Sequence, residues 1–181
     1  MAEEKKEIPD HSGKADGMGI RDAVSRPLKV VFLGAGSGFF HKLFGDILHI
    51  PGAERGEIAL VDIDPDRLEL ARGVAERIVE IMKADWKVTA STDRREVLEG
   101  ADYIVNCIEV SGLQAVKHDN DIPLKYGVDQ CIGDTIGPGG LFKTLRTVPV
   151  FLDVLRDVRE LAPGAIVLNY TNPMNMLCLA A

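Results

Sequence analysis

The chain alternates short apolar runs with longer segments in which apolar residues recur every three or four positions. A short continuous apolar run is typical of a strand buried on both faces, whereas the longer period is typical of a helix with one buried side. The pattern predicts strands at residues 29–33, 57–61, 88–91, 103–108 and 165–168. It predicts helices at residues 38–50, 65–82, 93–100 and 141–161, the last bent at Pro149. This alternation favours an α/β fold, a doubly wound parallel sheet of the Rossmann-like kind.

The first part of the chain lacks this pattern. Residues 1–27 mix acidic and basic side chains with scattered glycine, serine and proline, and they offer too few apolar groups to offset the entropy of ordering. We therefore predict a flexible charged tail at 1–27 and one domain over 28–181.

Charge and cysteine usage exclude several classes of protein. The 21 Lys and Arg against 28 Asp and Glu give a net charge of −7, which would repel nucleic acid. No apolar run reaches the roughly 18 residues of a membrane span, and residues 2–10 are charged rather than apolar, unlike a secretory signal. Cys107, Cys131 and Cys178 are odd in number and follow no metal-ligand spacing, so we expect reduced thiols and a cytoplasmic protein. The four histidines share no ligand spacing either.

A glycine-rich segment follows the first predicted strand and leads into the first predicted helix. Backbone N–H groups of such a turn, together with the positive end of the helix, can hold the pyrophosphate of NAD. The first two glycines fit the dinucleotide-binding pattern, whereas the third comes one residue early and phenylalanine takes its place. A glycine-rich turn without a ligand is the alternative. The candidate cofactor-binding residues are Gly34, Gly36, Ser37, Gly38 and Phe39.

Asp62 ends the second predicted strand, 26 residues after Gly36. A carboxylate there can accept hydrogen bonds from the ribose hydroxyls and would repel a 2′-phosphate, which favours NAD over NADP. Asp62 could instead cap the following helix. Asp64 suits that role better because it directly precedes Pro65, and this leaves Asp62 for the ribose.

Three further segments carry a family resemblance. They are Asn106-Cys107-Ile108-Glu109-Val110-Ser111-Gly112, the stretch from Pro123 through Gly133-Asp134-Thr135-Ile136-Gly137-Pro138-Gly139-Gly140, and Asn169-Tyr170-Thr171-Asn172-Pro173-Met174. In order and spacing they resemble the glycoside hydrolases of family 4 across residues 28–181. The Gly-Asp-Thr loop with the following Leu-Arg-Thr-Val-Pro is similar to the α-galactosidase and α-galacturonidase branch.

The resemblance implies an unusual glycosidase chemistry that needs NAD. NAD⁺ takes hydride from C3 of the sugar, a base removes the proton at C2, and the glycosidic oxygen leaves by elimination. Water then adds, and NADH returns the hydride. A divalent metal, commonly Mn²⁺, polarises the sugar oxygens. The family's metal ligands, its base tyrosine and its second domain lie beyond Asn172, so we assign no metal ligand in this chain. We expect the chain to be incomplete relative to the family and inactive by itself.

The resemblance also assigns roles to single residues. Asp134 matches the catalytic position that supports the base, although it could merely order its glycine-rich loop. Asn172 matches the asparagine that contacts sugar hydroxyls, a role compatible with an Asx-turn before Pro173. Asn106 opens the first of the three segments and is a further cofactor-binding candidate.

Glu109 departs from part of the family in a way that bears on the substrate. Relatives acting on 6-phosphorylated sugars have an arginine there, and a carboxylate would repel a phosphate. The resemblance thus implies an unphosphorylated α-hexoside, a galactoside or a galacturonide. The galacturonide fits only if Glu109 points away or a cation neutralises it.

Two other readings stay open. The first is a fragment of a 2-hydroxy-acid dehydrogenase, whose Asp-x-x-Arg spacing occurs at Asp153 and Arg156, although this pair precedes the fifth strand and favours a surface ion pair. The second is a non-catalytic NAD-binding module. We also expect Cys178 to be a buried core thiol rather than a metal ligand, and residues 174–179 to present an apolar surface that makes the chain a homo-oligomer.

Overall fold

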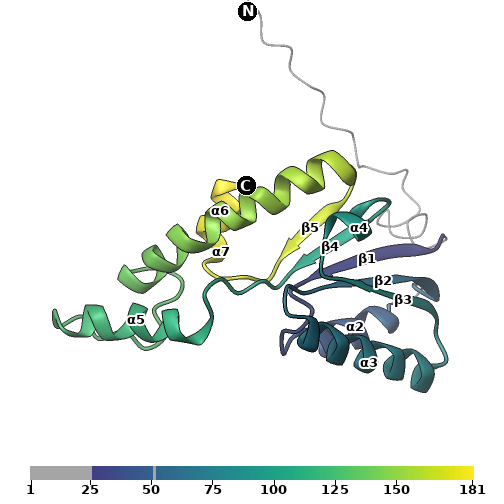
Figure 1. The fold of residues 1–181 in the computed structure, drawn as a ribbon, viewed down its shortest axis with the longest axis horizontal. Coiled ribbons are helices and arrows are strands. Elements are labelled where there is room, and N and C mark those ends of the chain that lie inside the picture. Colours follow the sequence, from purple (N-terminus) through teal and green to yellow (C-terminus); the bar gives the residue numbers. More distant parts are fainter. Residues whose placement is uncertain (1–25, 51) are drawn as a thin grey trace, which may run out of the picture.

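The computed structural model describes residues 26–50 and 52–181, so all but the end of the predicted 1–27 tail lies outside the described residues. Its centre is a five-stranded sheet in the order β3-β2-β1-β4-β5 (Figure 1). All four strand pairs are parallel. The strands are β1 (Leu28–Leu33), β2 (Arg55–Val61), β3 (Asp85–Ser91), β4 (Tyr103–Asn106) and β5 (Ile166–Asn169). This order confirms the doubly wound parallel sheet.

Helices connect the strands. They are α2 (Phe40–Leu48), α3 (Pro65–Met82), α4 (Arg95–Leu98), α5 (Gly112–Leu124), α6 (Pro138–Leu161) and α7 (Met174–Ala180). The start of α3 is as expected: Asp64 accepts hydrogen bonds from the N–H groups of Asp66 and Arg67 at 3.0 and 3.2 Å. Helix α6 continues through Pro149 as one helix of 24 residues.

Helices cover both faces of the sheet because alternate residues of each central strand point to opposite sides. On one face, Val30 and Phe32 of β1 pack with Phe44 of α2 and Ala75 of α3. On the other face, Val31 and Leu33 of β1 pack with residues of α4 and α6. Both cores exclude water from the centre of the sheet, which fixes the carboxyl ends of β1, β2 and β4 beside one another.

The structure corrects several predicted boundaries. Strand β3 starts at Asp85 rather than 88 because Trp86 is buried there, with its ring nitrogen donating to the Ala53 carbonyl at 3.0 Å. The glycine-rich loop delays α2 to Phe40, and the expected strand at 103–108 ends at Asn106. Helix α6 starts at Pro138, a residue suited to a first helical turn.

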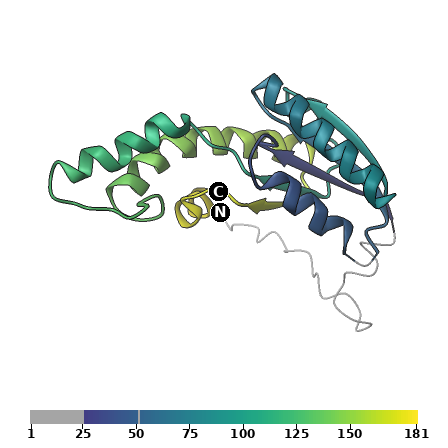
Figure 2. The same ribbon diagram turned by 90° about the horizontal axis from the view of Figure 1, so that it is seen from below.

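Helix α5 was missed because its sequence mixes polar and apolar residues without a clear stripe and contains Pro123 near its end. It packs on α6 and, with the first half of that helix, projects beyond the sheet, as both views show (Figures 1 and 2). Arg146 of α6 holds Asp119 of α5 through two hydrogen bonds, at 2.9 and 2.5 Å. Asp119 is buried, so this pair fixes the projecting helices to each other.

The end of the chain differs from the expectation for its cysteine. Cys178 is exposed, and the buried residue of α7 is its neighbour Leu177, because successive residues of a helix point about 100° apart. Met174 and Leu179 are exposed, as an apolar surface at 174–179 requires. No helix in the described part of the chain is long and apolar enough to cross a membrane.

Candidate functional site

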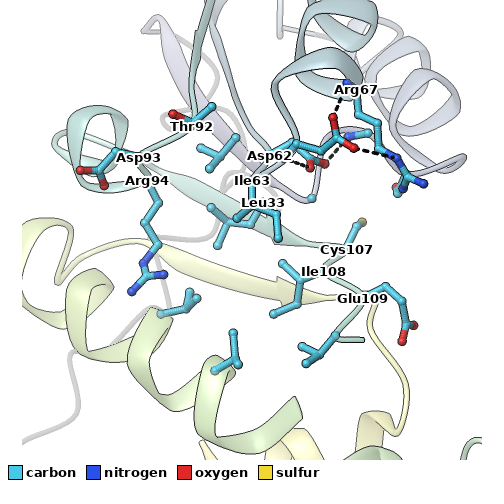
Figure 3. A pocket seen from close by; sticks show the side chains of 18 of the residues that line it. Leu33, Asp62, Ile63, Arg67, Thr92, Asp93, Arg94, Cys107, Ile108 and Glu109 are labelled. Carbon is cyan, nitrogen blue, oxygen red and sulfur yellow. Dashed lines mark hydrogen bonds and ion pairs between the residues drawn. The ribbon is translucent and has the colours of Figure 1, made fainter. Parts of the chain in front are cut away.

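A cavity of about 620 Å³ opens at the carboxyl ends of β1, β2 and β4 (Figure 3). Strands β1 and β4 are neighbours in the sheet, and the connections that follow them run in opposite directions, from β1 to β2 and from β4 to β5. Ligands of doubly wound proteins bind at this kind of position because the loops separate there. The cavity is therefore the candidate cofactor site. Figure 3 shows Asp62 and Ile63 on one side and the side chains of α6 on the other.

The glycine-rich loop forms one wall through close backbone approaches. Gly34 has φ +79°, and a Cβ on it would lie 2.7 Å from the Cys107 carbonyl oxygen. A Cβ on Gly36 would lie 2.8 Å from a carboxylate oxygen of Asp62. A Cβ on Gly38 would meet no atom of the described residues within 4 Å, so the end of the loop stands open in front of α2. The close approaches explain why Gly34 and Gly36 are glycines. The open space at Gly38 leaves room for a phosphate group.

Asp62 lines the cavity and links two backbone segments. Its Oδ2 accepts a hydrogen bond from the Gly36 N–H at 2.8 Å, and its Oδ1 accepts one from the Asp64 N–H at 3.0 Å. Asp64 caps α3, as the sequence suggested, so the Asp62 carboxylate does not serve as that cap. Asp62 instead lines the cavity.

The other predicted cofactor residues divide into two groups. Ser37 lines the cavity with Gly34 and Gly36, whereas Gly38 and Phe39 do not, and Phe39 is 60% exposed at the start of α2. Asn106 is fully buried between β4 and β5, where its Nδ2 donates to Asn169 Oδ1 at 2.9 Å. Its own Oδ1 is buried without a hydrogen-bond partner in the described part of the chain.

Arg94 is a cavity residue that the sequence analysis missed. It lies in the turn after β3, and it donates to Asp153 and to Asp157 of α6, each at 2.6 Å. Burial tends to raise the pKa of Asp157, but the hydrogen bonds from Arg94 and Arg95 outweigh this and hold its pKa below the ordinary value. The position of Arg94 after a predicted strand could have indicated this role, because the carboxyl end of β3 meets the same sheet edge as the ends of β1 and β2.

A second polar cluster brings three predicted residues together at the end of the cavity where Glu109 is a lining residue. Lys143 of α6 places its Nζ 2.9 Å from Glu109 Oε2 and 3.9 Å from Asp134 Oδ2. Asn172 donates to the same Asp134 oxygen at 3.3 Å. Glu109, Asp134 and Asn172 come from three loops that are far apart in sequence, so the fold gathers the residues that the family resemblance singled out.

Lys143 is the second residue that the sequence analysis missed. It is 7% exposed and shares a face of α6 with the buried Gly139 and Thr147, four residues to either side. A lysine inside a stripe of buried positions needs a partner charge, since an unpaired buried ammonium is costly. The position of Lys143 among buried residues of α6 could therefore have indicated a charged partner.

The described residues fit a dinucleotide better than a metal ion. The cavity, the close glycines and the carboxylate of Asp62 match the needs of a pyrophosphate followed by a ribose. Within residues 26–50 and 52–181 there is no group of three or more His, Cys, Asp or Glu side chains that could hold a metal ion.

Comparison with known proteins identifies the family. The sequence model of the family 4 glycosyl hydrolases matches residues 29–181. The chain belongs to this family. An α-galactosidase of Rhizobium meliloti (strain 1021) is 51% identical over 155 residues, which cover 84% of this chain and 32% of that protein. An α-galactosidase of Bacillus subtilis (strain 168) is 40% identical over 151 residues, 82% of this chain and 35% of that protein.

Solved structures agree with this assignment. The 6-phospho-β-glucosidase of Thermotoga maritima, determined with manganese, NAD⁺ and glucose-6-phosphate, is 28% identical with a TM-score of 0.71. The match covers 81% of this family 4 chain and 35% of that structure. The chain thus spans about a third of the length of the relatives it matches.

Proposed function

We propose that this family 4 chain is the NAD-binding part of a glycosidase that cleaves an unphosphorylated α-hexoside, a galactoside or a galacturonide. The observation that carries the proposal is the cavity in which Asp62 meets the glycine-rich loop at the switch point of the sheet. The similarity to two α-galactosidases supports the substrate class.

In this proposal the cavity residues hold NAD. Backbone groups of residues 34–38 and the start of α2 bind the pyrophosphate, because the glycines let the ligand approach closely. Asp62 accepts hydrogen bonds from the ribose hydroxyls and disfavours a 2′-phosphate. When bound, NAD⁺ supplies the reversible removal of hydride from C3 of the sugar.

The polar cluster at the end of the cavity contacts the sugar. Asn172 binds sugar hydroxyls through its side-chain amide, and Asp134 raises the basicity of the group that takes the C2 proton. Lys143 holds Asp134 and Glu109 in place through its ammonium group. Elimination of the glycosidic oxygen follows loss of that proton.

The remaining chemistry requires residues that relatives carry in the other two thirds of their length. Mn²⁺ belongs to the complete enzyme in this proposal, with ligands outside this chain, so we expect the chain alone to be inactive. We further propose that the enzyme works in the cytoplasm as a homo-oligomer, which the three free cysteines and the exposed apolar residues of α7 support.

Calorimetric titration of the purified chain with NAD⁺ and with NADP⁺ tests the proposal. We expect saturable NAD⁺ binding, weaker NADP⁺ binding, and a loss of about tenfold or more in NAD⁺ affinity for Asp62→Ala, since hydrogen bonds to a carboxylate contribute about 1.5 to 3 kcal/mol. Asp66→Ala, on an exposed helical residue nearby, is the matched control and should bind like the parent. Absence of binding by both dinucleotides contradicts the proposal.

A non-catalytic NAD-binding module would give the same titration and is distinguished by activity. The chain joined to the remaining two thirds of an α-galactosidase relative, with Mn²⁺ and NAD⁺, should cleave an aryl α-galactoside. A fully folded, NAD-binding product with no cleavage would favour the non-catalytic module.

A further inference from the structure

The ion pair between Lys143 and Glu109 is unequally buried. The Lys143 side chain is 9% exposed and the Glu109 side chain 42% exposed, with 2.9 Å between Nζ and Oε2. Figure 3 shows Glu109 at the end of the cavity wall, turned away from the middle of the cavity. The more exposed Glu109 carboxylate therefore neutralises the buried Lys143 ammonium group.

Among the described residues, Glu109 is the closest counterion of Lys143. Asp134 is farther away, at 3.9 Å, and shares its Oδ2 with Asn172. The nearby cation Arg146 is taken by Asp119, which accepts two hydrogen bonds from it. Glu109 and Lys143 thus neutralise each other, and repulsion by a bare carboxylate does not describe this position.

We propose that Glu109 acts as a built-in anion, a side-chain carboxylate that occupies Lys143 and so keeps a sugar phosphate or a uronate from binding there. A neutral hexose needs no free cation, and it can donate hydroxyl hydrogen bonds to the exposed Glu109 carboxylate. The inference rests on the proposed function, because it takes the polar cluster as the sugar site. It narrows the substrate class to neutral α-hexosides.

Removal of the built-in anion should create an anion site. In Glu109→Gln the buried ammonium loses its nearest counterion, which costs free energy unless another anion replaces it. An anionic sugar can supply that charge, whereas a neutral sugar cannot. The change in preference therefore requires Lys143.

The test titrates the 181-residue chain with galactose, galactose 6-phosphate and galacturonate, following amide chemical shifts by NMR. Glu109→Gln should bind galactose 6-phosphate or galacturonate at least about tenfold more tightly than the parent, with little change for galactose. The double variant Glu109→Gln/Lys143→Met should lose this gain. Glu76→Gln, an exposed carboxylate on α3, is the control and should behave like the parent.

Two results would overturn the inference. One is a Glu109→Gln variant with native circular dichroism and no gain for either anionic sugar. The other is a gain that persists in the double variant, since Lys143 would then not be its source. NAD⁺ titration of the parent and the variants separates this inference from the proposed function. Absence of NAD⁺ binding by the parent counts against the cofactor site, whichever sugars bind.

Discussion

The Gly36 N–H donates a hydrogen bond of 2.8 Å to Asp62 Oδ2, across 26 residues of sequence. A single carboxylate thereby fixes the glycine-rich loop against the end of β2, at the place where the ribose of a dinucleotide lies in doubly wound proteins. Asp62 consequently has a structural role, and we propose that it also binds the ribose. Replacement by alanine affects both, so the control at an exposed neighbour is necessary when its cofactor affinity is measured.

The aromatic cluster beneath α2 should dominate stability on its face of the sheet. Phe44 is fully buried, and its ring centroid lies 6.0 Å from that of Trp86. We expect Phe44→Ala to lower the free energy of unfolding by about 3 to 5 kcal/mol, because it leaves a cavity in the core. Phe39→Ala, at a 60% exposed position, should change it by less than about 0.5 kcal/mol.

Urea titration followed by fluorescence measures both variants, because Trp86 is the only tryptophan of the chain and is buried. Equal effects of the two substitutions would contradict the assignment of Phe44 to the core.

Much of this arrangement could be predicted from the sequence, for identifiable reasons. Continuous apolar runs located β1 and β2, and the Asp64-Pro65 pair located the start of α3. The Asp153 and Arg156 side chains form the expected surface pair, at 3.7 Å. Helix α5 escaped because its contact with α6 depends on a buried ion pair, which hydrophobic periodicity does not detect.

The site was predicted less completely than the fold. Pattern and resemblance supplied Asp62, Glu109, Asp134 and Asn172. They did not supply Lys143, the helix residue that pairs with Glu109 and Asp134. Its pairing depends on how three loops converge in space. Cys178 was wrongly expected in the core, because an apolar sequence neighbourhood does not say which side of α7 is covered.

The projecting helices should separate when their buried ion pair is broken. Asp119→Ala leaves Arg146 without its partner, and breaking a buried pair is strongly destabilising. We expect faster amide hydrogen exchange in α5 by about tenfold or more, with the sheet amides little changed. Asp121→Ala, which removes an exposed ion pair with Lys117, is the control and should leave α5 protected. Uniform loss of protection over the sheet would contradict this view.

Stability should fall in acid partly through Asp157. Its folded-state pKa lies below the ordinary value of about 4, so its contribution is present above that value and is lost as pH falls through the folded pKa. We expect Asp157→Asn to cost about 1 to 3 kcal/mol at neutral pH and progressively less below about pH 4. Urea titrations at several pH values measure this. The exposed Asp153→Asn is the comparison, and a cost for Asp157→Asn that grows in acid would refute the assignment.

Self-association should depend on the exposed apolar residues of α7. Leu179 is 90% exposed, and an apolar side chain at such a position favours contact with another surface. We expect the chain to associate at high concentration and Leu179→Glu to weaken that association by about tenfold or more. Sedimentation velocity over a range of concentrations decides the matter, and a parent chain that stays monomeric throughout would rule it out.

Hydrogen exchange with and without NAD⁺ tests the central claim, that the cavity at the switch point holds the dinucleotide. The predicted footprint is increased protection in residues 34–40, 62–67 and 107–111, with α5 unchanged. Saturable NAD⁺ binding with protection elsewhere, or with none in these segments, would contradict the cofactor site described by Asp62 and Gly36.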